Sequence, residues 1–232
     1  MFKKILMIVA CAFYASSASA TTFLISEIDP AQGRSNVGGI NFYEAFFNEV
    51  TEEFSYTINL DPNSSGDFAN LFTFAVNNGP NPKVGDLALA YVDLDSDLFT
   101  VYNYNGGRFS YREETGFITS LDDAVTSTFN ADGTRTVNIS LDATEINSFD
   151  GGPNFSGIQF DSLFSQWTHT SFGAEIEYAA TGQISSILLG TAGAFIDSAN
   201  RPTIDGAEVP EPLTLSLLGM GLLGGALKRK KA

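Results

Sequence analysis

The sequence is poor in the residues that most enzymes use as nucleophiles, bases and metal ligands. Its 232 residues contain one cysteine, Cys11, and one histidine, His169. A lone cysteine allows no disulfide within the chain, so the fold must depend on its core. A lone histidine excludes the histidine-rich sites that bind zinc or copper. With no Gly-x-Ser-x-Gly motif in the chain, His169 is interpreted as a packed or surface residue, and no catalytic residue is assigned.

Positive charge is also scarce, and half of the basic residues lie near the chain ends. Between residues 21 and 208 there are 26 acidic and six basic residues, so this stretch carries a net charge of about −20. Such a field repels phosphate backbones, which excludes nucleic acid as an expected partner. No Gly-rich phosphate loop joins a strand to a helix, so no nucleotide cofactor is expected.

The first 20 residues have the pattern of an export signal. Two lysines precede an apolar stretch, residues 5–15, and Ala18 and Ala20 are the small residues at which signal peptidase cleaves. As a helix the stretch would measure roughly 16 Å, which is too short to span a hydrocarbon core of ~30 Å. The alternative is a lipoprotein box that ends at Cys11, although only six apolar residues would precede it.

The C-terminus combines an apolar stretch with a block of cations. Residues 213–227 carry no charge, and Lys228, Arg229, Lys230 and Lys231 follow directly. This stretch predicts a transmembrane helix of roughly 22 Å, which snorkelling lysines can extend. A positive cluster after an apolar helix stays cytoplasmic, so the rest of the chain is expected outside. The alternative is a buried C-terminal helix of the domain.

Pro210, Glu211 and Pro212 stand immediately before that apolar stretch. Two prolines forbid helix there and hold the backbone extended. An extended strip beside a membrane is what a processing enzyme needs in order to grip a backbone. The order Val-Pro-Glu-Pro, Leu-Thr-Leu, a Gly-rich apolar helix and a basic end, over residues 209–232, resembles the sorting signal of PEP-CTERM proteins.

The resemblance implies how the protein is handled after synthesis. PEP-CTERM proteins are exported bacterial proteins recognised by the membrane protease-transferase exosortase, and here Pro210, Glu211 and Pro212 would be the recognition residues. The helix would be removed after export, and the protein would reach the outer surface or extracellular matrix of a Gram-negative-type bacterium, with an exopolysaccharide as a candidate partner. The resemblance covers residues 209–232 and is silent about the domain before them.

Residues 21–208 predict one all-β domain, an antiparallel β-sandwich with jelly-roll-like connections. Short runs of alternating polar and apolar residues are bounded by Gly, Pro, Asn and Asp, as in strands and their turns. The expected strands are 54–60, 71–76, 86–94, 99–104, 125–130, 134–141, 175–180 and 184–189. Hairpins are expected at 125–141 and 175–189, and the Asn-Gly pair at 105–106 predicts another that continues into 108–112. Helix is expected only at 42–51 and 142–149.

Asp93, Asp95 and Asp97 form the run most suggestive of a metal site. Alternate aspartates at a strand end would direct oxygens at one Ca²⁺, a cation that takes six to eight oxygen ligands. The run is not an EF-hand loop, because its sixth position is Leu98 and its twelfth is Tyr104. The alternative is a polar turn between two strands.

The sequence also allows two alternatives to a noncatalytic surface protein, namely a glycan-binding module and a glycan hydrolase. Exposed aromatic residues would form a glycan-binding surface, and the candidates are Tyr102, Tyr104, Tyr111 and Trp167. A glycan hydrolase would need only one placed pair of carboxylates, and the chain has too many for composition to choose a pair. Each aromatic candidate has the simpler interpretation of a sheet or core residue.

Overall fold

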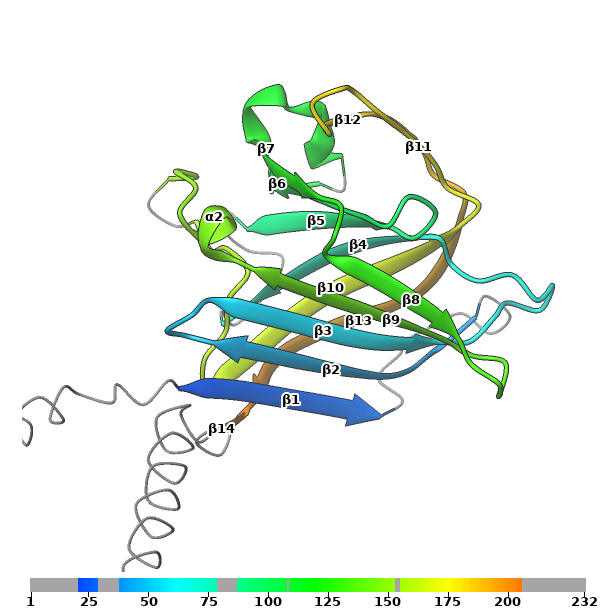
Figure 1. The fold of residues 1–232 in the computed structure, drawn as a ribbon, viewed down its shortest axis with the longest axis horizontal. Coiled ribbons are helices and arrows are strands. Elements are labelled where there is room, and N and C mark those ends of the chain that lie inside the picture. Colours follow the sequence, from blue (N-terminus) through cyan, green and yellow to red (C-terminus); the bar gives the residue numbers. More distant parts are fainter. Residues whose placement is uncertain (1–20, 29–37, 79–86, 108, 153–154, 206–232) are drawn as a thin grey trace, which may run out of the picture. The chain divides into compact units, whose positions relative to one another are not determined.

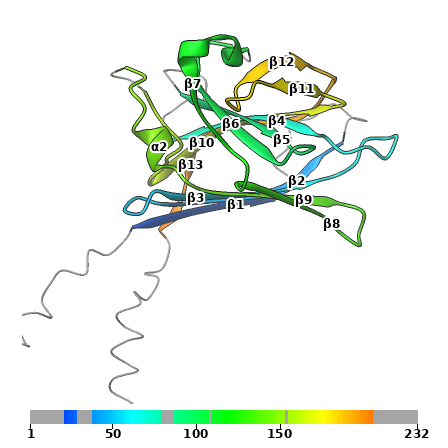
Figure 2. The same cartoon turned by 45° about the horizontal axis from the view of Figure 1, so that its top comes forward.

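The computed structural model describes residues 21–28, 38–78, 87–107, 109–152 and 155–205. Residues 22–205 form one compact unit. Within it, two antiparallel sheets pack face to face, which confirms the predicted all-β sandwich (Figures 1 and 2).

The described residues place six strands in each of the two sheets. The first has the order β14-β1-β2-β3-β9-β8, and the second has the order β13-β10-β4-β5-β6-β7. The strands of the first sheet are β1 (Thr22–Ile28), β2 (Ile40–Asn48), β3 (Glu53–Leu60), β8 (Val125–Phe129), β9 (Arg135–Asp142) and β14 (Ile204–Asp205). Those of the second are β4 (Leu71–Asn77), β5 (Ala88–Asp93), β6 (Leu98–Asn103), β7 (Phe117–Leu121), β10 (Leu163–Phe172) and β13 (Thr191–Pro202).

The strand order differs from the jelly-roll connections that were expected. A jelly roll is built from two Greek keys, in which a fourth strand returns beside the first. Here β1, β2 and β3 are consecutive neighbours, and so are β4, β5, β6 and β7. This order of neighbouring strands makes the sandwich largely two antiparallel meanders packed against each other.

The main core lies between the two sheets and is rich in aromatic rings. Alternate residues of β3 point inward, so Phe54, Tyr56 and Ile58 are almost fully buried. Phe72 and Phe74 of β4 face them from the other sheet, and the rings of Tyr56 and Phe74 lie 4.7 Å apart. This burial of aromatic area, rather than any disulfide, holds the sheets together.

A second core covers the outer face of the second sheet. The hairpin of β11 (Glu175–Tyr178) and β12 (Ile184–Leu188) forms a separate two-stranded sheet, and the 3₁₀ helix η1 (Ser110–Arg112) lies near it. Leu89, Tyr91 and Tyr102 of the sheet pack there against Tyr111 and Ile184. As a result every residue of β4 and β5 is buried, because both of their faces are covered.

Two predicted elements were wrong. Residues 42–51 were expected to be helical but lie mostly in β2, where Tyr43, Ala45 and Phe47 alternate into the core. The predicted hairpin into 108–112 is replaced by η1, a second 3₁₀ turn η2 (Glu114–Gly116) and then β7, which pairs with β6. The short helix expected within 142–149 is present as α2 (Thr144–Asn147).

Candidate functional site

The predicted export and sorting residues lie outside the described part of the chain. They are Ala18, Ala20, Pro210, Glu211, Pro212, Lys228, Arg229, Lys230 and Lys231. Among the described residues, no helix is both long and apolar enough to cross a membrane. The roles of these export and sorting residues therefore stay predictions.

Asp93, at the end of β5, has both carboxylate oxygens engaged by the protein. Its Oδ1 accepts hydrogen bonds from the backbone N–H groups of Asp95 at 3.0 Å and Ser96 at 3.4 Å. Its Oδ2 accepts one from the hydroxyl of Tyr178 at 3.1 Å, and the side chain is buried. Asp93 thus holds the turn between β5 and β6 and ties the β11–β12 hairpin to it.

The other two aspartates of the run have different surroundings. Asp95 Oδ2 accepts a hydrogen bond of 2.6 Å from the side-chain amide of Asn70, and Asp97 is exposed with a positive φ of 55°. Across the described ranges, no three His, Cys, Asp or Glu side chains gather closely enough to hold a metal. The geometry matches the polar turn, which was the alternative prediction, and it supplies no ligand set for calcium.

The four aromatic residues predicted to form a glycan-binding surface are all buried or partly buried in the second core. Tyr102 and Tyr111 are only 1% and 6% exposed, and both pack edge-on against Tyr91 with ring centroids 5.8 Å away. These two are therefore core residues and no part of a glycan-binding face. Tyr104 and Trp167 are partly buried at the edge of the same cluster.

His169 belongs to a stack of three rings on neighbouring strands. Its ring centroid lies 4.8 Å from that of Trp167 on β10 and 5.3 Å from that of Phe195 on β13. The rings of His169 and Phe195 are inclined by only 20°. Because His169 stacks on Phe195 and meets Trp167 at a tilt of 51°, its ring is packed on both neighbours, which supports the interpretation of His169 as a packed residue.

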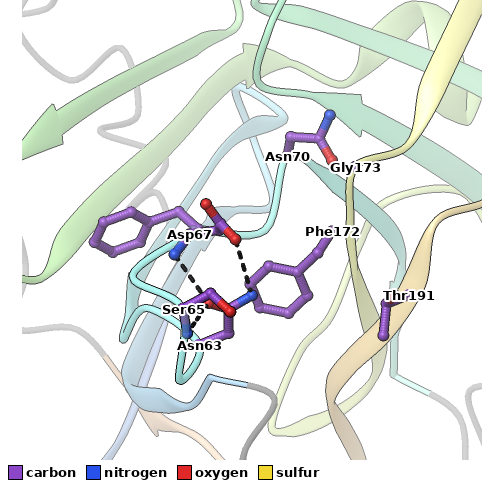
Figure 3. Close-up of a pocket in the computed structure, with 8 residues that line it drawn as sticks. Asn63, Ser65, Asp67, Asn70, Phe172, Gly173 and Thr191 are labelled. Carbon is purple, nitrogen blue, oxygen red and sulfur yellow. Dashed lines mark hydrogen bonds between the residues drawn. The ribbon is translucent and has the colours of Figure 1, made fainter.

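A cleft of about 580 Å³ lies where the β3–β4 loop meets the ends of β10 and β13. This volume is in the range of small-molecule sites. Figure 3 shows the loop residues on one side of the cleft and Thr191 on the other, with the ring of Phe172 pointing from β10 toward the loop. Its lining residues are Asn63, Ser65, Asp67, Phe68, Asn70, Phe172, Gly173 and Thr191.

Asn63 gives the loop wall of the cleft its shape. Its Oδ1 accepts hydrogen bonds from the backbone N–H groups of Ser65 at 2.8 Å and Asp67 at 2.9 Å. The backbone N–H of Asn63 donates in turn to the carbonyl of Asp67 at 2.8 Å. Asparagine favours such turns because its side chain imitates a backbone acceptor. The result is a closed loop that presents Ser65 and Asp67 to solvent.

Asn70 fastens the loop to the second sheet. Its Oδ1 accepts from the backbone N–H of Ala174 at 3.0 Å, and its Nδ2 donates to the Ala174 carbonyl at 2.8 Å. Gly173, beside this contact, has a φ of +61°, and a Cβ added there would meet no atom within 4 Å. Space for a side chain is therefore open at Gly173, which lines the cleft, while its left-handed conformation disfavours other residues.

Two glycines make room for the ring of Phe172. A Cβ added at Gly38 would lie 2.9 Å from its Cζ, and one added at Gly193 would lie 2.7 Å from its Cε2. The ring is 9% exposed, so it is both a core residue and part of the cleft. The space left by Gly38 and Gly193 therefore fixes the position of the Phe172 ring at the edge of the cleft.

A second cleft, of about 690 Å³, lies on the first sheet and contains two carboxylates. Glu53 and Asp142 are direct partners in the register of β3 and β9. Hydrogen bonds from the side chain and backbone of Thr144 lower the pKa of Asp142, so this carboxyl stays ionised. A glycosidase pairs one carboxyl of raised pKa, its acid, with one ionised carboxylate, and Asp142 fits only the ionised member of such a pair.

Sequence reasoning missed the first cleft. Residues 61–70 were taken only as the connection between the strands expected at 54–60 and 71–76, and Phe172 and Gly173 carried no recognised motif. The available signal was the density of Asn, Ser, Gly and Asp in 61–70, which exceeds what one tight turn needs.

Comparison with known proteins adds no functional assignment. No family model and no curated protein matches this chain, so its function must be inferred from its own residues.

Proposed function

We propose that this chain is an exported bacterial protein of the cell surface or extracellular matrix, sorted through its C-terminal segment by exosortase. The observation that carries the proposal is the order of features from residue 209 onward: Pro210, Glu211 and Pro212, then fifteen uncharged residues, then four cations. This order resembles the PEP-CTERM sorting signal. Neither a plain anchor nor a buried helix requires prolines at that position.

The chemistry of each part suggests a sequence of events. Signal peptidase cleaves after Ala20, and the chain crosses the membrane until residues 213–227 enter it as a transient anchor. The cationic block stays on the cytoplasmic side. The Pro-Glu-Pro strip, which cannot become helical, is then held extended at the outer surface, where a peptidase can bind its backbone.

The domain is proposed to be noncatalytic. His169 lies in a ring stack, and Asp93 is committed to a turn and to Tyr178. The acidic surface, about −20 over residues 21–208, suits a protein that must stay soluble outside the cell. A dense aromatic core replaces the disulfides that many exported domains use.

The test is the intact mass of the protein from cells that contain exosortase. We expect a chain that begins at Thr21 and ends between Pro210 and Pro212, with or without added mass. The variant Glu211→Ala should keep its tail, whereas the matched variant Glu208→Ala should be processed like the parent. A parent mass that extends to Ala232 would reduce the tail to an anchor and refute sorting by exosortase.

A further inference from the structure

The cleft at the β3–β4 loop is lined by both polar and aromatic side chains. Asp67, Ser65 and Thr191 supply oxygens, while Phe172 and Phe68 supply aromatic surface. We propose that this cleft binds one unit of a neutral glycan. The proposal goes beyond export and sorting and does not depend on them.

The polar side chains of the cleft suit the hydroxyl groups of a sugar. Among the described residues, the carboxylate of Asp67 accepts only a long hydrogen bond, 3.4 Å from Asn63 Nδ2. A carboxylate has about four lone-pair directions, so Asp67 can accept hydrogen bonds from two neighbouring hydroxyls. Bonds to a charged acceptor are stronger than neutral ones, and the side chain is already exposed. Ser65 and Thr191 each add a hydroxyl that can donate or accept.

The aromatic side chains of the cleft suit the apolar face of the same ligand. A pyranose ring has an apolar face of C–H groups as well as a rim of hydroxyls, and that face packs on aromatic rings. Phe172 offers part of its ring, and Phe68 is partly exposed and braced edge-on by Phe129, with ring centroids 5.4 Å apart. A ligand that is polar throughout, such as a small inorganic ion, would leave these two rings unused.

The cleft is ordered before any ligand binds. Asn63 closes the loop through two backbone N–H groups, and Asn70 ties it to Ala174 through both ends of its amide. A preorganised site does not lose loop entropy on binding, which raises affinity. The open backbone at Gly173 lets a ligand approach without meeting a side chain.

The negative charge at the cleft favours a neutral glycan over an acidic one as the ligand. Asp67 is the charged residue of the cleft lining, and Asp95 lies close by because it binds Asn70. No lysine or arginine is among the lining residues in the described part of the chain. An anionic sugar would therefore meet repulsion both locally and from the field of the whole domain. A neutral glycan avoids both costs.

The experiment is affinity electrophoresis of the full chain in gels that contain dextran, galactomannan, mixed-linkage β-glucan or polygalacturonate, followed by calorimetry with the oligosaccharide of the retained polymer. We expect retardation by at least one neutral polymer and none by polygalacturonate. Asp67→Ala should weaken binding at least tenfold, because a charge-assisted hydrogen bond is lost. Asp67→Asn should weaken it less, since the amide still accepts one bond.

Asp123→Asn is the matched control for charge. Asp123 is exposed and precedes β8, at the end of that strand opposite Phe129, so its loss should leave the affinity unchanged. Melting curves of all variants check that the loop variants fold. The proposal is overturned if no neutral polymer retards the chain, if Asp67→Ala binds as tightly as Asp123→Asn, or if binding is abolished by EDTA and so depends on a bridging cation.

Discussion

At the scale of single residues, the ring of Phe172 is placed by two glycines, Gly38 and Gly193, which leave room for it because they have no side chain. Gly193 and Gly38 border the ring so closely that a methyl group at either would overlap it. The backbone near Gly193 is further fixed by Thr170, whose hydroxyl donates to the carbonyl of Ala194 at 3.1 Å. Close packing of this kind transmits a small change directly to the cleft.

Gly193→Ala should therefore destabilise the domain. The new Cβ would collide with Thr170 Oγ1 and lie 2.7 Å from Phe172 Cε2. Overpacking of this type costs about 1–3 kcal/mol, which urea denaturation would measure. Gly107→Ala is the control, because a Cβ there meets no atom within 4 Å and should change stability by less than about 0.5 kcal/mol. Equal stability of the two variants would contradict the packing argument.

Predictions for single residues were correct where the residue interacts with its neighbours in the sequence. Asp93 could be read as part of a polar turn because a strand, a short acidic run and a second strand follow one another. Its bond to Tyr178, 85 positions further on, could not be read, since it depends on where the hairpin folds back. The cleft could not be predicted for the same reason. Asp67 and Thr191 lie far apart in the sequence and line one cleft only in the folded domain.

At the scale of elements, the β11–β12 hairpin covers the outer face of the second sheet and forms part of the second core. Ile184 is 4% exposed, and its backbone N–H donates to the hydroxyl of Tyr102 at 2.8 Å. The hairpin therefore contributes both apolar area and a hydrogen-bonded link to the second sheet.

Ile184→Ala should destabilise the whole domain, by about 2–4 kcal/mol, because it opens a cavity in the second core. Leu188→Ala removes a similar volume from the same hairpin at a position that is 64% exposed, so it should be nearly neutral. Denaturant unfolding gives both values. If Ile184→Ala left global stability intact but increased hydrogen exchange in β11 and β12 alone, the hairpin would be a separately unfolding unit.

Element prediction failed at residues 42–51 and 108–112 for different reasons. The first segment contains Phe, Tyr, Glu and Ala, which suit a helix or a strand, and pairing with the strands β1 and β3 on either side selects the extended form. In the second, the Asn-Gly signal was read as a two-residue hairpin turn. The chain instead enters a 3₁₀ turn that buries Tyr111, because the outer face of the sheet needs covering. The hairpins of β8–β9 and β11–β12, whose strands pair locally, were predicted correctly.

At the scale of the whole molecule, buried tyrosines make the fold sensitive to alkali. Burial raises the pKa of five tyrosines above the ordinary value of 10.0, with Glu27 beside Tyr43 and Asp93 beside Tyr178 adding to the effect. The other three are Tyr56, Tyr91 and Tyr102. Above pH 10 the unfolded chain loses these protons while the folded chain keeps them.

The free energy of unfolding should thus be insensitive to these groups below pH 10 and fall steeply above it. Urea denaturation across this range, with tyrosinate absorbance as a second probe, should show ionisation of these residues coinciding with unfolding. Tyr178→Phe should make the fall less steep, because one titrating group is removed. Smooth ionisation of all tyrosines well before unfolding would show that the rings are accessible in the folded state.

The pairing of β1 with β14 has a consequence for how the domain would be displayed. Phe23 lies opposite Asp205, so the chain enters and leaves the sandwich at one place, beside the β2–β3 turn. The cleft follows the far end of β3, eight residues away, or about 25 Å along the strand (Figure 1). A domain held at Asp205 would present the cleft from the end of β3 opposite the point where the chain leaves the sandwich.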